Sequence, residues 1–191
     1  MNYRFVERIS IIVIIFAGLS CTRQVPVFGE NGMVVSTSRH ASQVGVDILK
    51  EGGNAVDAAV AVGFALAVTS SSNGNIGGGG FMVSKLSSGK IFTLDYREMA
   101  PSNAERDMYL DTDKNIIKDK SRKTHFASGV PGSVDGLLKA WRDYGSGNIS
   151  RVQLLAPAIS LAEEGFNLSE YEADRFNNNK DRLSQHSETK R

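Results

Sequence analysis

The sequence predicts a layered α/β fold, and three neighbouring segments predict it. Residues 54–68 form an Ala- and Val-rich segment with a single charge, at Asp57, which predicts a helix buried on all sides. A glycine-rich turn over residues 73–80 follows, and two strand-like runs over residues 81–86 and 91–97 come after it. A helix without a polar face belongs between layers, and its alanines permit close approach to a sheet. These features favour a layered α/β architecture over a helix bundle.

The N-terminal residues predict export. Arg4 and Arg8 precede an uncharged stretch over residues 9–22, and Arg23 closes it. This apolar stretch is too short to span a bilayer comfortably and has the size of a signal-peptide core. We therefore expect residues 1–20 to be a signal peptide that directs a bacterial protein to the periplasm.

The only cysteine of the chain, Cys21, predicts a lipid anchor. The run Gly18-Leu19-Ser20-Cys21 resembles a relaxed bacterial lipoprotein box, with Gly where Leu is usual three positions before the cysteine. We expect lipidation at Cys21, which would tie the protein to a membrane, and residues 21–31 to form a tether. A plain secretory signal with an incidental cysteine, or an uncleaved anchor, stays open as an alternative.

A short strand and two helices are expected before the glycines. The β-branched run at residues 33–35 predicts the strand. Hydroxyl side chains follow it and can cap a helix over residues 41–50, which Gly52-Gly53 ends because glycine adopts the left-handed conformation without strain. Asn54 can cap the buried helix, and Asp57 lies in its first turn, where the helix macrodipole favours a negative charge.

The four glycines at residues 77–80 indicate a position where only hydrogen fits at Cα, because such a run is entropically costly. Either two backbones or a ligand and a backbone approach each other there. The run lacks the spacing of a phosphate-binding loop and follows a helix rather than a strand. The two strand-like runs after it form a hairpin joined by residues 87–90, and their imperfect alternation predicts a sheet covered on both faces.

The second half of the chain predicts a surface excursion and two more helices. Residues 105–125 are charged and poorly periodic, so we expect a surface excursion with a short helical turn. Residues 133–144 have helical spacing. A capping box at residues 150–153 begins a helix that Pro157 interrupts or kinks. Residues 167–191 are polar, and we expect this tail to be disordered or to continue into a longer protein.

Composition excludes several kinds of site. The net charge is +1 with scattered basic residues, which argues against nucleic-acid binding. The three histidines are far apart without ligand spacing, so no metal and no cofactor is predicted. No nucleophile stands beside a base in the sequence, so no catalytic residue is predicted within the chain.

Arg97 is the best single binding candidate. It follows a strand and lies between Asp95 and Glu98. A guanidinium there suits bidentate binding of a ligand carboxylate. The alternative is a structural ion pair with either acidic neighbour, which chemistry alone favours by roughly two to one.

Several motifs resemble the γ-glutamyltranspeptidase family. They are EGGNAVDAAVA at residues 51–61, GNIGGGGFM at 74–82, DYREMAP at 95–101, SGVPGSV at 128–134, LAPA at 155–158 and AEEGF at 162–166. The resemblance covers about residues 32–166, in the family's order and spacing.

The resemblance implies an N-terminal-nucleophile hydrolase with an αββα sandwich. The family's precursor cleaves itself, and the new N-terminal threonine of the small subunit attacks the γ-glutamyl amide of glutathione or related compounds. The acyl group then passes to water or to an amino-acid or dipeptide acceptor. In the family, the arginine matched by Arg97 binds the α-carboxylate of the γ-glutamyl group. No catalytic threonine motif occurs here, so we expect residues 32–166 to be the N-terminal part of a large subunit, with an incomplete sandwich that is inactive without its small subunit.

Two alternatives remain open. One is a related acylase of the same fold that acts on β-lactam side chains, although the motif around Arg97 argues against it. The other is a non-catalytic exported lipoprotein that keeps a γ-glutamyl-binding surface.

Overall fold

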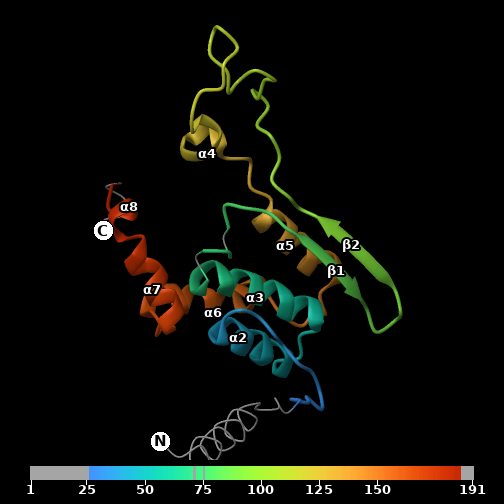
Figure 1. Ribbon diagram of the computed structural model, residues 1–191. Helices are drawn as coiled ribbons and strands as arrows, with labels where there is room; N and C mark the ends of the chain where they lie inside the picture. Colours follow the sequence, from blue (N-terminus) through green and yellow to red (C-terminus); the bar gives the residue numbers. More distant parts are fainter. Residues whose placement is uncertain (1–25, 71, 75, 186–191) are drawn as a thin grey trace, which may run out of the picture. The chain divides into compact units, whose positions relative to one another are not determined.

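The computed structural model describes residues 26–70, 72–74 and 76–185 (Figure 1). The chain divides into two units, residues 1–33 and 34–191. The predicted signal peptide and Cys21 lie outside the described residues. None of the helices in the described part is both long enough and apolar enough to cross a membrane.

The predicted strand at residues 33–35 is not formed. The prediction is wrong because a β-branched run becomes a strand only beside a partner, and no described segment pairs with it. Val34 instead places its side chain beside Gly45, where a Cβ would lie 2.8 Å from it.

Local capping sets the limits of the next two helices. Helix α2 (Arg39–Lys50) begins where the Ser38 hydroxyl accepts from the Ala41 N–H, and Gly52 follows its end with a φ of +91°. Helix α3 (Ala55–Thr69) begins at a capping box, in which Asn54 and Asp57 each accept from the other's backbone N–H. Both helices confirm the sequence prediction.

Helix α3 is the centre of the core. It packs against α2, α5 (Ser133–Tyr144) and α6 (Arg151–Glu164), as Figure 1 shows. The predicted buried helix is confirmed, and the hairpin adds Phe92 to the same core. The core side chains that are almost fully enclosed come from all four helices and the loop before α6: Ala41, Ile48, Val60, Ala61, Ala65, Ala140, Ile149 and Leu154.

Strands β1 (Phe81–Lys85) and β2 (Ile91–Asp95) form the predicted antiparallel hairpin, in which Phe81 pairs with Asp95. One face packs on α5 through Phe92, whose ring stacks on Tyr144 with centroids 3.7 Å apart. The opposite face is exposed along Phe81, Val83 and Ile91. Among the described residues, helices therefore cover one of the two faces of the predicted hairpin.

The remaining elements follow local signals, with two exceptions. Residues 105–125 form the predicted excursion, with α4 (Lys120–Lys123) and the 3₁₀ turn η1 (His125–Ala127) near its end. Helix α6 runs unbroken through Pro157, so the predicted interruption is wrong; proline removes only its own N–H donor from the helix. The tail contains α7 (Glu170–Asn178) and α8 (Lys180–Leu183), so the expectation of disorder is wrong there. The missed signal is a capping box, in which the side chains of Ser169 and Glu172 fix the start of α7.

Candidate functional site

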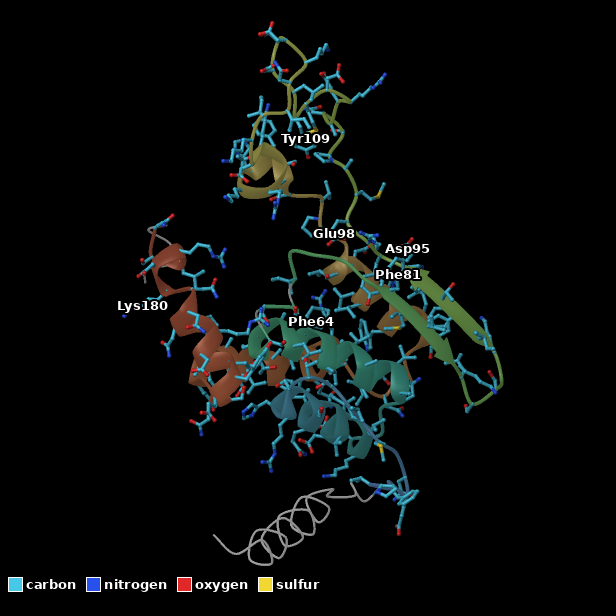
Figure 2. The ribbon with its side chains drawn as sticks, viewed as in Figure 1. Phe64, Phe81, Asp95, Glu98, Tyr109 and Lys180 are labelled. Atoms are coloured by element: carbon cyan, nitrogen blue, oxygen red, sulfur yellow. The ribbon has the colours of Figure 1, made fainter. Side chains whose placement is uncertain are left out.

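Arg97 directly continues the hairpin. Tyr96 donates its N–H to the Gly80 carbonyl at 3.0 Å and accepts from the Gly80 N–H at 3.4 Å, so the ladder extends beyond β2. Asp95 turns its carboxylate toward the backbone and accepts the Arg97 N–H at 3.1 Å. Figure 2 shows Phe81, Asp95 and Glu98 close together at this end of the hairpin. Strand pairing therefore fixes the backbone from which the guanidinium extends.

The chain that follows the candidate arginine is also fixed. Met99 and Val130 exchange two backbone hydrogen bonds, of 3.1 and 2.8 Å. The Gly78 carbonyl accepts from the N–H groups of Gly132 and Ser133 at 2.9 and 3.0 Å. Helix α5 has no side-chain cap, so the glycine turn satisfies its first N–H groups. The arginine segment thus lies between the glycine turn and the start of α5.

The guanidinium itself keeps most of its donors free among the described residues. The Arg97 side chain is 64 % exposed, and its Nε lies 3.9 Å from Glu98 Oε2. Its Cζ lies 5.8 Å from the centroid of the Phe81 ring. A single long contact between exposed groups contributes little stability, and the geometry is not the bidentate fork of a strong pair. The described contacts therefore do not support the structural ion pair as the reason for Arg97.

A hollow of about 270 Å³ lies beside the arginine. Arg97, Tyr96, Asp135 and Lys139 are among its lining residues. Lys139 donates to Asp143 at 2.6 Å, and this hydrogen bond with the carboxylate's charge raises the pKa of Lys139. The hollow thus has two cationic side chains, Arg97 and Lys139, and the carboxylate of Asp135 on its walls. A ligand that carries both a carboxylate and an amine would meet groups of opposite charge here.

The glycine run is a close approach of two backbones, as one of the two sequence interpretations predicted. A Cβ at Gly79 would lie 2.6 Å from the Cα of Arg97 and 2.6 Å from the N of Glu98. Sequence reasoning missed Gly132 and Gly136, which face the same segment from α5. The sequence did contain a signal for this contact: a glycine inside a predicted helix usually has a packing reason, and Gly132 and Gly136 lie at the start of the helix predicted over residues 133–144.

The other candidate chemistry does not assemble. His40 contacts the Asn167 carbonyl, and His125 lies against its neighbour Phe126. Across the residues that the structure describes, no group of three or more His, Cys, Asp or Glu side chains is arranged to hold a metal ion. The Thr69 hydroxyl, next to the glycine turn, donates to the Ala65 carbonyl within α3, so it is engaged by its own helix.

Comparison with known proteins gives consistent matches. The sequence model of the family described as Gamma-glutamyltranspeptidase matches residues 41–191, which extends past the motifs recognised in the sequence. A glutathione hydrolase proenzyme of Pseudomonas sp. (strain A14) is 53% identical over 151 residues, which are 79% of this chain and 26% of that protein. The chain thus spans about a quarter of the length of the curated relatives it matches.

Two solved structures extend the comparison. The gamma-glutamyltranspeptidase of Helicobacter pylori has a TM-score of 0.81 at 41% identity, covering 86% of this chain and 47% of that one. A cephalosporin acylase from Bacillus halodurans has a TM-score of 0.68 at 30% identity, covering 86% and 30%. These likenesses confirm the predicted α/β class and its relation to N-terminal-nucleophile hydrolases. The chain belongs to the gamma-glutamyltranspeptidase family.

Proposed function

We propose that this chain is the N-terminal part of the large subunit of a γ-glutamyl-transferring enzyme. Its donors are glutathione and related γ-glutamyl compounds, and its acceptors are water, amino acids or dipeptides. The nucleophilic threonine belongs to a small subunit from the same precursor. The curated relatives named glutathione hydrolase proenzyme support this proposal.

The observation that carries the proposal is the guanidinium of Arg97. Its backbone is held by strand pairing, while its side chain is exposed and makes one long contact, to Glu98 at 3.9 Å. A planar fork held in this way can donate two parallel hydrogen bonds to the α-carboxylate of a γ-glutamyl donor. Binding that end of the donor orients its γ-amide toward the attacking threonine, and orientation lowers the barrier to acyl transfer.

The test is a substitution series in the complete protein that contains this chain. Arg97→Ala should weaken donor binding by about 2–5 kcal/mol, as when one partner of a buried charge pair is removed. Arg97→Lys should recover only part of this, because an ammonium cannot reproduce the fork. Arg106→Ala, in the exposed excursion, is the matched control for loss of an arginine. The measurements are kcat and KM for a γ-glutamyl anilide and the Kd for L-glutamate.

The outcome shows whether Arg97 binds the donor carboxylate. A higher KM and Kd for Arg97→Ala, with Arg106→Ala unchanged, supports carboxylate binding. Unchanged kinetics and unchanged glutamate affinity in Arg97→Ala would refute it.

A second candidate function is hydrolysis of β-lactam side chains. The likeness to a cephalosporin acylase favours it. Turnover of a cephalosporin side chain that lacks an α-carboxylate, insensitive to Arg97→Ala, would select the acylase. Glutamate binding without any turnover would instead select the non-catalytic lipoprotein.

We propose further that the protein is exported and lipid-anchored. The arginine-flanked apolar stretch over residues 9–22 and the position of Cys21 behind small residues support this proposal. Residues 1–20 would then be removed, and the lipidated Cys21 would hold the enzyme at the periplasmic face of a membrane.

A further inference from the structure

Four glycines lie against Tyr96 and the peptide unit that joins it to Arg97. Two lie in the turn before β1 and two lie at the start of α5. We call this group the glycine cradle: Gly79, Gly80, Gly132 and Gly136.

Two members of the cradle touch backbone atoms. A Cβ at Gly79 would lie 2.6 Å from both the Arg97 Cα and the Tyr96 carbonyl oxygen. A Cβ at Gly132 would overlap that same oxygen and lie 3.0 Å from the Arg97 carbonyl oxygen. Ordinary contacts need about 3.5–4.0 Å. Backbone atoms cannot rotate aside, so a side chain at either glycine would move the strand that carries Arg97 by about 1 Å.

The other two members hold the Tyr96 side chain between them. A Cβ at Gly136 would overlap the Cβ and Cγ of Tyr96 and lie 2.7 Å from its Cδ1. A Cβ at Gly80 would lie 2.9 Å from Cε2 on the ring. The Cβ position follows from the backbone, so Tyr96 cannot escape Gly136 by a rotamer change alone. A side chain at position 136 would therefore displace the backbone of Tyr96 and, with it, the backbone of Arg97.

A glycine at position 136 destabilises the helix relative to alanine, so its presence needs a reason in the packing. Gly136 is helical, and its N–H donates to the Gly132 carbonyl at 2.9 Å. Inside a helix, alanine is ordinarily more stable than glycine, because glycine loses more backbone entropy. The close approach to Tyr96 removes that advantage, and so gives the glycine a specific role.

We propose that the glycine cradle, through Gly136 in particular, positions Arg97 to receive the ligand carboxylate. This inference rests on the proposed function of Arg97. Gly136 does not touch the ligand; it acts through Tyr96. A displacement of about 1 Å is enough to lower catalytic efficiency on the order of 100-fold, because bidentate recognition needs both donors aligned.

The test compares two helix-interior glycines in the complete protein. Gly136→Ala is the test variant. Gly45→Ala is its control. Gly45 lies in α2, where a Cβ would lie 2.6 Å from Val62 of α3, so the added methyl group is also crowded but lies against α3 and not against the arginine segment. Each variant is measured for the thermal midpoint, for the Kd of L-glutamate, and for kcat and KM with a γ-glutamyl anilide.

Gly136→Ala should raise the Kd and KM on the order of 10- to 100-fold, with a much smaller change in kcat. Gly45→Ala should lower the thermal midpoint and leave the Kd and KM at wild-type values. Wild-type affinity in Gly136→Ala, or an equal loss of affinity in Gly45→Ala, would overturn the positioning role.

Two further variants keep the result decisive. If Gly136→Ala fails to fold, Gly80→Ala serves in its place: its Cβ would press on the outer end of the Tyr96 side chain and should raise the Kd more mildly, and an unchanged Kd there overturns the proposal. If Arg97→Ala leaves the Kd unchanged, the proposed function itself fails. If Arg97→Ala weakens binding and the glycine variants do not, the cradle alone is wrong.

Discussion

Replacing Asp57 should destabilise the helical core more than any change at a surface carboxylate. Asp57 is fully buried in the first turn of α3. Its Oδ2 accepts two backbone N–H groups, from Asn54 at 2.8 Å and from Ser146 at 2.9 Å. The first bond completes the capping box of α3. The second ties that helix to the loop between α5 and α6, which is 89 residues away in sequence.

The magnitude follows from those two bonds. A hydrogen bond to a charged group contributes about 1.5–3 kcal/mol, so Asp57→Ala should lower the free energy of unfolding by about 3–6 kcal/mol. Asp57→Asn keeps one oxygen for both N–H groups but places an amide where Oδ1 has no hydrogen-bond partner among the described residues. An unsatisfied buried donor costs about 1–3 kcal/mol, so the loss in Asp57→Asn should be about half as large.

The assay combines urea unfolding with hydrogen exchange on the purified full-length protein. Asp47→Ala, which removes an exposed carboxylate on α2, is the control and should change stability by less than about 0.5 kcal/mol. In Asp57→Ala, the amides of Asn54 and Ser146 should lose protection before the amides within α3 do. Unchanged protection at both amides, with an unchanged urea midpoint, would refute the reasoning.

Three further predictions concern the hairpin, its tyrosine and the N-terminus. Phe92→Ala should cost about 3–5 kcal/mol of unfolding free energy, because it removes the ring stacked on α5, while Ile91→Ala on the exposed face should cost much less; equal losses in urea unfolding would contradict this. Burial raises the pKa of Tyr96 above its ordinary value of about 10, so the stability present below pH 10 should fall as pH rises through the folded-state pKa. Tyr96→Phe should lack that alkaline loss, and a pH series of unfolding midpoints checks it. Inhibiting lipoprotein signal peptidase should make the precursor accumulate, whereas normal processing of Cys21→Ser would exclude lipidation.

Local chemistry in the sequence determined where most helices begin and end. The caps at Ser38, Asn54 and Ser150 each act within three residues, so the sequence contains the whole interaction. The same holds for Ser169, whose capping box was present in the sequence but was not recognised. The family motifs were equally readable, and they implied a carboxylate-binding role for Arg97, which its charge and position had already made a candidate.

The tertiary structure alone decided what the glycines and the strands contact. The sequence allowed a ligand or a backbone near Gly79, and only the folded chain brings it against Arg97. The partners of the glycine turn on α5 lie more than 50 residues further along the chain, as in the pairing of Gly78 with Gly132. No local pattern encodes such a separation.

Which face of the hairpin is exposed was likewise decided only by the tertiary structure. The imperfect alternation around Val83 and Ile91 indicates apolar residues on both faces of the hairpin, but not which layer covers each face. In the described residues α5 covers one face through Phe92 and Tyr144. Periodicity depends on the side chains of one segment, whereas burial depends on which distant segments pack against it, and that is decided only when the chain folds.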